Sequence, residues 1–379
     1  MIEKEKIAII AITKHGSALA EKIYTALEKS ELFISAKFKK EIPGKVTFFE
    51  TPIKDLTAKI FDSYDALVYI VSLGAVVRTI APFLKDKHTD PAVIVVDDKA
   101  NFSISVLSGH VGGANELTEE IAKITGAKPV ITTASDVGKT IPVDILGREF
   151  GWTTELGENI TKVSASVVNE EPVGIYQDAG EKNWWKRETP LPKNFKIFDS
   201  LDALAASDSK AALIITDRIL DERYADLLKK TVLYRPKSLA LGMGCDKGVA
   251  QEQLDQLLED TFKTHKLSVK SVKNVSTVDL KNREAGLLAF CERRGWELVS
   301  YTREELVKLK DILPNPSEMV MKYLKIPGVS EPAAMMTAKT DQLVVEKTKV
   351  PMATLAAARI NFEAPKPEAA AAQKESVGV

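Results

Sequence analysis

The sequence predicts an α/β protein whose mostly parallel sheets are covered by helices on both faces, giving three layers. Two observations lead to this fold class. Short apolar runs rich in Val and Ile recur along the chain, and a glycine-containing loop and a stretch of helical apolar spacing usually follow them. Strands and helices that alternate at this length are typical of parallel sheets. The 379 residues are 45% hydrophobic and 28% charged, enough for two or three such domains.

The first unit of this kind begins near the N-terminus. An apolar run at 7–12 precedes a short loop and a helix at 17–28, in which Leu19, Ile23 and Leu27 share one face. Residues 1–150 repeat the pattern, and we predict one N-terminal α/β domain there. Its further strands are expected at 46–49, 66–71, 92–96, 102–107 and 128–132. Two further helices are expected at 53–61 and 116–125, and another follows the segment 72–78 and ends at Leu84.

The remaining chain predicts two more parts. Residues 151–236 are less regular and contain a clear strand at 212–216, so they form either a smaller middle α/β domain or an elaborate connection. A C-terminal α/β domain is expected at 237–362, with strands at 239–241, 269–274, 297–300, 343–346 and 353–360 and helices at 249–262, 283–294 and 303–310. Residues 363–379 have almost no large apolar side chains, which predicts a disordered tail.

Composition excludes several classes of protein. The 52 basic and 53 acidic residues nearly cancel, so we expect no nucleic-acid partner. No apolar run reaches the roughly 18 residues that cross a bilayer, so we expect no membrane partner. The two cysteines, Cys245 and Cys291, are far apart and form no disulfide framework, which indicates a cytoplasmic protein.

The loop at 107–115 is the strongest candidate site. Gly109, Gly112 and Gly113 let the backbone approach a ligand, and exposed N–H groups there suit an anionic group. His110 is its one side chain able to move a proton near neutral pH, and Asn115 is a good N-cap for the next helix. A tight turn, with His110 hydrogen-bonded to the backbone, explains the pattern equally well.

Two other strand–loop–helix junctions are weaker candidates. Gly74 and Arg78 lie in the segment 72–78, where the Arg78 fork could hold a carboxylate, although the pattern alone favours a solvated arginine. The segment 242–248 is predicted as a glycine-rich loop at a helix start, where the helix dipole would lower the Cys245 pKa. His265 is about four turns along that helix, so a small loop residue is favoured over a nucleophile. No two His or Cys residues have metal-ligand spacing, so no metal site is predicted.

These segments together resemble the cobalt-precorrin-5A hydrolase family of anaerobic cobalamin (vitamin B12) biosynthesis. The resemblance covers about residues 7–362. SLGAVVRTIAPFLKDKHTDPAVIVVDD and FSISVLSGHVGGANELTEEIA look like the N-terminal half of the family. LGMGCDKG, STVDLKNREAGLLAF and GVSEPAAM resemble its C-terminal domain, which also occurs as a separate small protein in the oxygen-dependent pathway. Asp246 departs from the pattern, because a basic residue usually stands there, and Lys247 would have to contact a substrate carboxylate instead.

The resemblance implies a hydrolase that opens the δ-lactone of cobalt-precorrin-5A and releases acetaldehyde, giving cobalt-precorrin-5B. The small-molecule tetrapyrrole brings its own cobalt, so no cofactor is expected, and neighbouring pathway enzymes are candidate partners. We hypothesise that His110 is the base that activates water and that backbone N–H groups hold the oxyanion. Both glycine-rich loops are expected to face one crevice. The residues expected to bind substrate are Gly74, Arg78, Gly109, Gly112, Gly113, Asn115, Gly242, Gly244, Cys245, Lys247 and Gly248.

Three alternatives stay open at this point. A non-catalytic carrier could hold the corrin intermediate for the next enzyme. A dinucleotide-dependent oxidoreductase is less favoured, because the GxGxxG fingerprint is missing and the helix after the 107–115 loop starts with acids. An esterase or acyltransferase is weaker still, because no GxSxG elbow is present.

Overall fold

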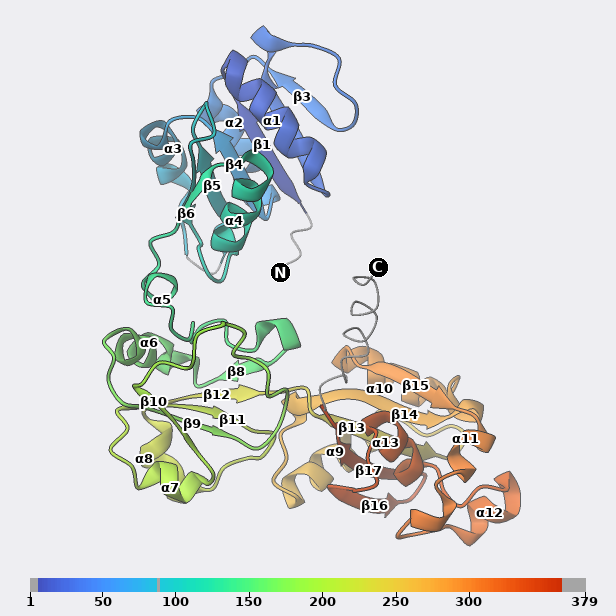
Figure 1. Ribbon diagram of the computed structural model, residues 1–379. Helices are drawn as coiled ribbons and strands as arrows, with labels where there is room; N and C mark the ends of the chain where they lie inside the picture. Colours follow the sequence, from blue (N-terminus) through green and yellow to red (C-terminus); the bar gives the residue numbers. More distant parts are fainter. Residues whose placement is uncertain (1–5, 87–88, 363–379) are drawn as a thin grey trace, which may run out of the picture. The chain divides into compact units, whose positions relative to one another are not determined.

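The computed structural model describes residues 6–86 and 89–362, which contain three β-sheets packed against helices (Figure 1). These residues form two compact units. One comprises the chain up to Glu149 together with Ile160–Glu171, and the other comprises Phe150–Asn159 and the chain from Pro172 onward. The mixed and parallel sheets confirm the predicted α/β fold class. Residues 363–379, for which a disordered tail is predicted, lie outside the described residues.

The first unit is built on a seven-stranded sheet with the order β3-β2-β1-β4-β5-β6-β7, in which the β5–β6 pair alone is antiparallel. Its strands are β1 (Ile7–Ala11), β2 (Ser30–Ser35), β3 (Val46–Phe49), β4 (Ala66–Ile70), β5 (Ala92–Val96), β6 (Phe102–Leu107) and β7 (Lys128–Val130). Its helices are α1 (Lys14–Ala26), α2 (Ile53–Ile60), α3 (Leu73–Ile80), α4 (Ala114–Thr125), α5 (Ala134–Val137) and α6 (Ile160–Val168).

Two separate cores give this unit its three layers. One face of the sheet packs against α1 and α4 through residues such as Ile23 and Leu117. The opposite face packs against α2 and α3 through residues such as Leu56 and Ile80. The central strands β1, β4 and β5 are buried along their whole length, which explains why they were predictable as continuous apolar runs.

The structure corrects several predicted elements of the first unit. Strand β2 was not predicted, because its sequence begins with Ser-Glu and lies directly after a helix. Helix α1 begins at Lys14 rather than at residue 17, because the Thr13 hydroxyl caps it by accepting from the Gly16 N–H. Helix α4 begins at Ala114, and Gly113 occupies the N-cap position that was predicted for Asn115.

The second unit contains the middle and C-terminal sheets. The middle sheet has the order β10-β9-β11-β12-β8, with β8 antiparallel to the parallel others. The segment 151–236, for which a middle domain or a connection is predicted, therefore contains a five-stranded sheet. Its elements are β8 (Thr153–Glu155), β9 (Val173–Gln177), β10 (Phe195–Phe198), α7 (Leu201–Ala205), β11 (Ala211–Ile215), α8 (Ala225–Leu228) and β12 (Thr231–Arg235).

The C-terminal sheet has the order β15-β14-β13-β17-β16. Its strands are β13 (Leu239–Cys245), β14 (Val272–Val278), β15 (Glu297–Tyr301), β16 (Val345–Val350) and β17 (Ala353–Arg359). Its helices are α9 (Gln251–Thr264), α10 (Ala285–Arg294), α11 (Arg303–Val307), α12 (Glu318–Leu324) and α13 (Ser330–Ala338). Two predictions were wrong here. Residues 242–245 continue the strand β13 rather than forming a loop, and β14 begins at Val272 because a 3-10 turn occupies Val269–Ser271.

Helix α13, which was not predicted, explains why glycine stands inside β13. A Cβ atom at Gly242 would lie 1.7 Å from the Ser330 carbonyl oxygen at the start of that helix. Small side chains such as Ala240, Ala334 and Ala356 fill the same interface. Glycine is therefore required at this position for close helix–strand packing rather than for a turn.

Candidate functional site

His110 lies in a tight loop that joins β6 to α4. The Ala114 N–H donates to the Ser108 carbonyl at 3.1 Å, and the Asn115 N–H donates to the Gly109 carbonyl at 3.0 Å. Ser108 and Gly113 have positive φ angles of 55° and 76°, which turn the chain sharply at both ends of the loop. This turn points the His110 side chain toward the segment that follows β7.

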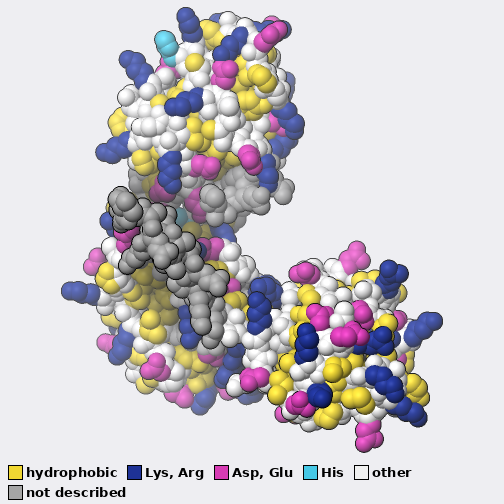
Figure 2. Space-filling view, turned by 45° about the vertical axis from the view of Figure 1, so that its right-hand side comes forward, with side chains coloured by type: hydrophobic (Ala, Val, Ile, Leu, Met, Phe, Trp, Pro, Cys, Tyr) yellow, Lys and Arg dark blue, Asp and Glu magenta, His cyan; other side chains and the backbone are white. Residues whose placement is uncertain are grey.

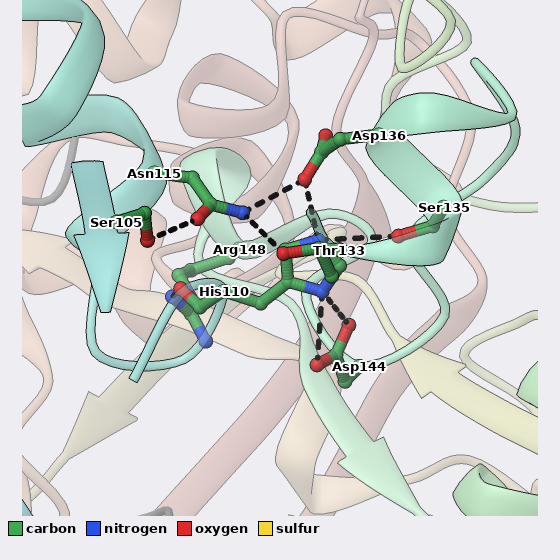
Figure 3. A network of polar contacts seen from close by, with 8 residues as sticks. All are labelled: Ser105, His110, Asn115, Thr133, Ser135, Asp136, Asp144 and Arg148. Carbon is green, nitrogen blue, oxygen red and sulfur yellow. Dashed lines mark hydrogen bonds and ion pairs between the residues drawn. The ribbon is translucent and has the colours of Figure 1, made fainter. Parts of the chain in front are cut away.

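Two carboxylates hold the His110 imidazole from opposite sides (Figure 3). Nε2 lies 2.8 Å from Asp136 Oδ2, and Nδ1 lies 3.2 Å from Asp144 Oδ1. The Ser135 hydroxyl lies 3.1 Å from Nε2. The His110 side chain is 12% exposed, whereas those of Asp136 and Asp144 are 33% and 27% exposed, so solvent reaches the cluster through its acids.

This environment changes the charge of His110. Its hydrogen bonds to Asp136 and Asp144 raise the pKa of the imidazole to about 9, although burial works in the opposite direction. Burial disfavours the ionised form of Asp144, but its hydrogen bond and charge interaction with His110 keep its pKa below the ordinary value. At neutral pH His110 is therefore an imidazolium that donates from both nitrogens.

Asn115 orients one of these carboxylates instead of capping α4. Its Nδ2 donates to Asp136 Oδ2 at 2.8 Å and to the Thr133 hydroxyl at 2.9 Å. Its Oδ1 accepts from the Ser105 hydroxyl at 2.7 Å. Since the Asn115 side chain is fully used in this way, the position of Asp136 is fixed from β6 and α4 as well as from α5.

Arg148 holds the backbone of the loop in place. Its Nη1 donates to the carbonyl oxygens of both His110 and Val111 at 3.1 Å. Burial lowers the pKa of the guanidinium, while the charges of Asp144 and Glu116 raise it, and the group stays a cation. The loop backbone is therefore held by a positive charge beside the His110 cluster.

The backbone N–H groups of the loop divide into two kinds. The Gly113 N–H donates to the His110 carbonyl at 3.0 Å, so its predicted role in holding an oxyanion is wrong. The N–H groups of Gly109 and Gly112 have no acceptor within the described residues. These two groups stay available for an anionic ligand.

The cluster is an arrangement of ion pairs rather than of metal ligands. Its carboxylates lie against different ring nitrogens, so they do not converge on one point. Across residues 6–86 and 89–362, no group of three or more His, Cys, Asp or Glu side chains could hold a metal ion.

Every helix in these ranges is too short or too polar to cross a lipid bilayer.

Arg78 is the remaining residue of the first unit whose side chain is predicted to bind the substrate. It lies exposed on α3, where its Nη1 donates to the Gly74 carbonyl at 3.3 Å. Gly74 itself is exposed in the first turn of the same helix. Both residues are accessible to a ligand, and their substrate contacts stay predictions.

The predicted residues of the second unit have two different environments. Gly242, Gly244 and Cys245 are part of β13, while Lys247 and Gly248 are exposed in the turn that follows. Burial raises the pKa of the Cys245 thiol to about 11, which contradicts the expected lowering by a helix dipole. A thiol that stays protonated at neutral pH is a poor nucleophile. Asp246 is exposed beside Lys247.

Sequence reasoning missed Asp136, Asp144 and Arg148. Asp136 had a usable signal, because the polar run after the strand at 128–132 begins at a carboxyl end, where ligands gather in parallel sheets. Asp144 and Arg148 had none, since they lie in an irregular segment 34 and 38 residues beyond His110.

Three family models match consecutive parts of the chain. Residues 55–136 match "Cobalamin synthesis G N-terminal", residues 141–236 match "Cobalamin biosynthesis central region", and residues 239–358 match "Cobalamin synthesis G C-terminus". The first two matches together include the whole His110 cluster: His110 and Asp136 lie in the first, and Asp144 and Arg148 lie in the second.

Curated relatives agree with these models. A protein of Priestia megaterium named cobalt-precorrin-5A hydrolase is 46% identical over 94% of this chain and 95% of its own length. A protein of the same name from Salmonella typhimurium is 31% identical over 88% of this chain and 92% of its own length. A third relative, Protein CobE of Sinorhizobium sp, is 29% identical and matches 32% of this chain and 79% of its own length. The chain therefore belongs to the cobalt-precorrin-5A hydrolase family.

Proposed function

We propose that this chain is a hydrolase of cobalamin biosynthesis that opens the δ-lactone of cobalt-precorrin-5A and releases acetaldehyde, giving cobalt-precorrin-5B. Family membership supports the substrate, since a relative 46% identical over nearly the full length has this name. The observation that supports the chemistry is the His110 cluster, where an imidazolium and two carboxylates lie beside unpaired backbone N–H groups. The tetrapyrrole brings its own cobalt, and we propose no further cofactor.

We assign the base to Asp136 rather than to His110. An imidazolium with a pKa of about 9 has no lone pair at neutral pH, so the carboxylates are the proton acceptors of the cluster. Asp136 is the more exposed of the two acids, and Asn115 and His110 both donate to its Oδ2. His110 then positions the Asp136 carboxylate and balances its negative charge, while the proton taken from water stays on Asp136.

The reaction begins with water. Asp136 takes one proton as the water oxygen attacks the lactone carbonyl carbon, and the N–H groups of Gly109 and Gly112 hold the resulting oxyanion. The ring C–O bond then breaks, giving an alkoxide and a carboxylic acid on the macrocycle, and the acid loses the second proton of the water molecule to solvent. The alkoxide becomes acetaldehyde when its carbon–carbon bond to the macrocycle breaks, and the electron pair passes into the macrocycle. That carbon finally takes up the proton removed from water.

An incubation in water labelled with oxygen-18 tests this function. One labelled oxygen is expected in the freed acetate of the ring product, together with one equivalent of acetaldehyde. A ring product without the label, or no acetaldehyde from the folded protein, would contradict hydrolysis at the lactone carbonyl. The second result, combined with stoichiometric binding of the substrate, would favour a carrier instead.

The cellular location is part of the proposal. Cys245 and Cys291 are both unpaired and buried. Free thiols are usual in a reducing compartment, which supports a cytoplasmic location.

A further inference from the structure

The second unit contains a cavity of about 850 Å³ that the proposed chemistry does not use. Its walls include Tyr176, Asp199 and Arg218, which lie at or just beyond the carboxyl ends of β9, β10 and β11. The strand order β10-β9-β11-β12 reverses direction between β9 and β11. In open parallel sheets, ligands bind at the carboxyl edge beside such a reversal, so the cavity lies where the fold favours a ligand.

The C-terminal domain forms the other wall of the cavity, and hydrogen bonds connect this wall to the middle domain. The buried Asp217 carboxylate accepts from Arg359 Nε at 2.8 Å and from Nη2 at 2.6 Å. The Ile219 N–H donates to the Lys266 carbonyl, and the Ser268 N–H donates to the Asp217 carbonyl, both at 2.7 Å. These bonds join the two domains of the unit directly at the cavity. The cavity is therefore preformed and does not have to be opened by a ligand.

Cationic side chains on the cavity wall are able to bind a new partner. Arg218, Arg223 and Lys266 are 57%, 63% and 62% exposed. Their present partners are acids, and ion pairs this exposed contribute little stability and exchange readily. Arg359 differs, because its bidentate pair with Asp217 is structural. Two separate segments, the connection after β11 and the turn after α9, thus present cations to the same space.

Apolar and aromatic groups form part of the wall, together with polar side chains such as Thr340 and Gln342. Tyr176, Tyr224, Ile219 and Leu343 line the cavity between the charged groups. Such a surface matches a large, flat ligand with an apolar body and carboxylates on its edge. A nucleotide matches it poorly, because the loop that presents Arg218 to the cavity has no glycine that would let backbone N–H groups approach phosphates.

We infer that this cavity binds a tetrapyrrole through its peripheral carboxylates, with Arg218, Arg223 and Lys266 as the charged contacts. The choice of ligand class rests on the proposed function, while the existence of the cavity does not. The site belongs to the second unit, whereas the His110 cluster belongs to the first.

Equilibrium dialysis of the full chain with cobyrinic acid, a stable cobalt corrin with free carboxylates, tests the inference. Arg223→Glu combined with Lys266→Glu is expected to weaken binding at least tenfold. Arg293→Glu is the matched control, because Arg293 is an exposed cation of the same unit outside the cavity, and it is expected to change binding less than twofold. Arg223→Gln alone, a milder change, covers the case in which the double variant does not fold.

Three results would overturn the inference. The first is unchanged binding by the folded cavity variants. The second is equal binding of the heptamethyl ester of cobyrinic acid, and the third is displacement of the acid by an equal concentration of ATP. Acetaldehyde release is measured in parallel on the wild type. If the wild type produces no acetaldehyde, but the cavity variants bind the corrin more weakly than the wild type does, the proposed function fails and the cavity assignment stands.

Discussion

The charge of His110 depends on its neighbours. Asp136 and Asp144 each accept from one ring nitrogen, and together they raise the pKa of the imidazole to about 9. An isolated histidine with the ordinary pKa near 6.5 could have been the base, as the sequence suggested. In the folded protein the same residue is an acid that balances two carboxylates.

Stability should depend on pH through this residue. Because the folded-state pKa of His110 is raised, its contribution is complete below about pH 6.5 and disappears as the pH rises through about 9. The wild type is expected to lose on the order of 2 kcal/mol of unfolding free energy over this range, allowing for solvent screening through the partly exposed Asp136 and Asp144. Urea denaturation at pH 6 and pH 10 measures the loss. His110→Gln should show a smaller loss, and equal losses in both proteins would exclude this origin.

Asp144 is expected to act as a positioning residue. Asp144→Asn removes one of the two charges that raise the His110 pKa, so the basic limb of the kcat against pH profile should move to lower pH. The rate at pH 7 should fall roughly 10- to 100-fold, less than for loss of a general base. Asp144→Glu should restore part of the rate. A reduced rate with an unmoved pH profile would indicate a merely structural role.

His110 could be singled out from the sequence, whereas only Asp136 among its partners had a signal there, and that signal did not connect it to His110. The glycines around it marked the loop at once, because three glycines in nine residues indicate an unusual backbone. Asp136, Asp144 and Arg148 lie 26 to 38 residues further along. Their contacts depend on how the chain after β7 folds back, which no local pattern records.

At the scale of single elements, glycine-rich segments of similar appearance have different structural causes. The glycines before α4 form a turn, whereas Gly242 and Gly244 lie inside the strand β13. From the sequence alone, both segments are predicted to be loops. Helix α13 makes the difference, since it packs so closely on β13 that a side chain at Gly242 would collide with its backbone. The buried strands β1, β4 and β5 were predictable because their apolar runs depend on no distant partner.

Gly242→Ala tests this packing. The new Cβ atom would meet the Ser330 carbonyl oxygen at 1.7 Å, so the variant should lose about 3 kcal/mol of unfolding free energy in urea denaturation. Gly74→Ala is the matched control. Its Cβ atom would meet nothing closer than 3.6 Å in a helix, and the variant should gain about 0.5 kcal/mol. A Gly242→Ala protein as stable as the wild type would contradict the packing explanation.

At the scale of the whole molecule, the class of the fold was predictable from the sequence, whereas most strands of the middle sheet were not. Strands β8, β9, β10 and β12 are short and were not recognised in the segment 151–236. The structure joins this sheet to the C-terminal sheet in one compact unit through the buried Asp217. A contact between residues 142 positions apart leaves no trace in local periodicity.

Arg359→Gln tests how far this buried pair stabilises the second unit. Removing the guanidinium leaves the Asp217 carboxylate buried without its bidentate partner, which should cost about 3–5 kcal/mol of unfolding free energy. Arg293→Gln, which removes an exposed arginine of the same unit, should cost less than about 1 kcal/mol. Equal midpoints in urea for the two variants would show that Asp217 is not held as described.

The rate of acetaldehyde release by Asp136→Asn tests the assignment of the chemistry to the His110 cluster. Loss of a general base should lower kcat roughly 10²–10⁴-fold while the protein stays folded by circular dichroism. Asp62→Asn, which changes an exposed acid of the same unit, should release acetaldehyde at the wild-type rate. An Asp136→Asn protein that keeps a rate within a few-fold of the wild type would contradict the assignment.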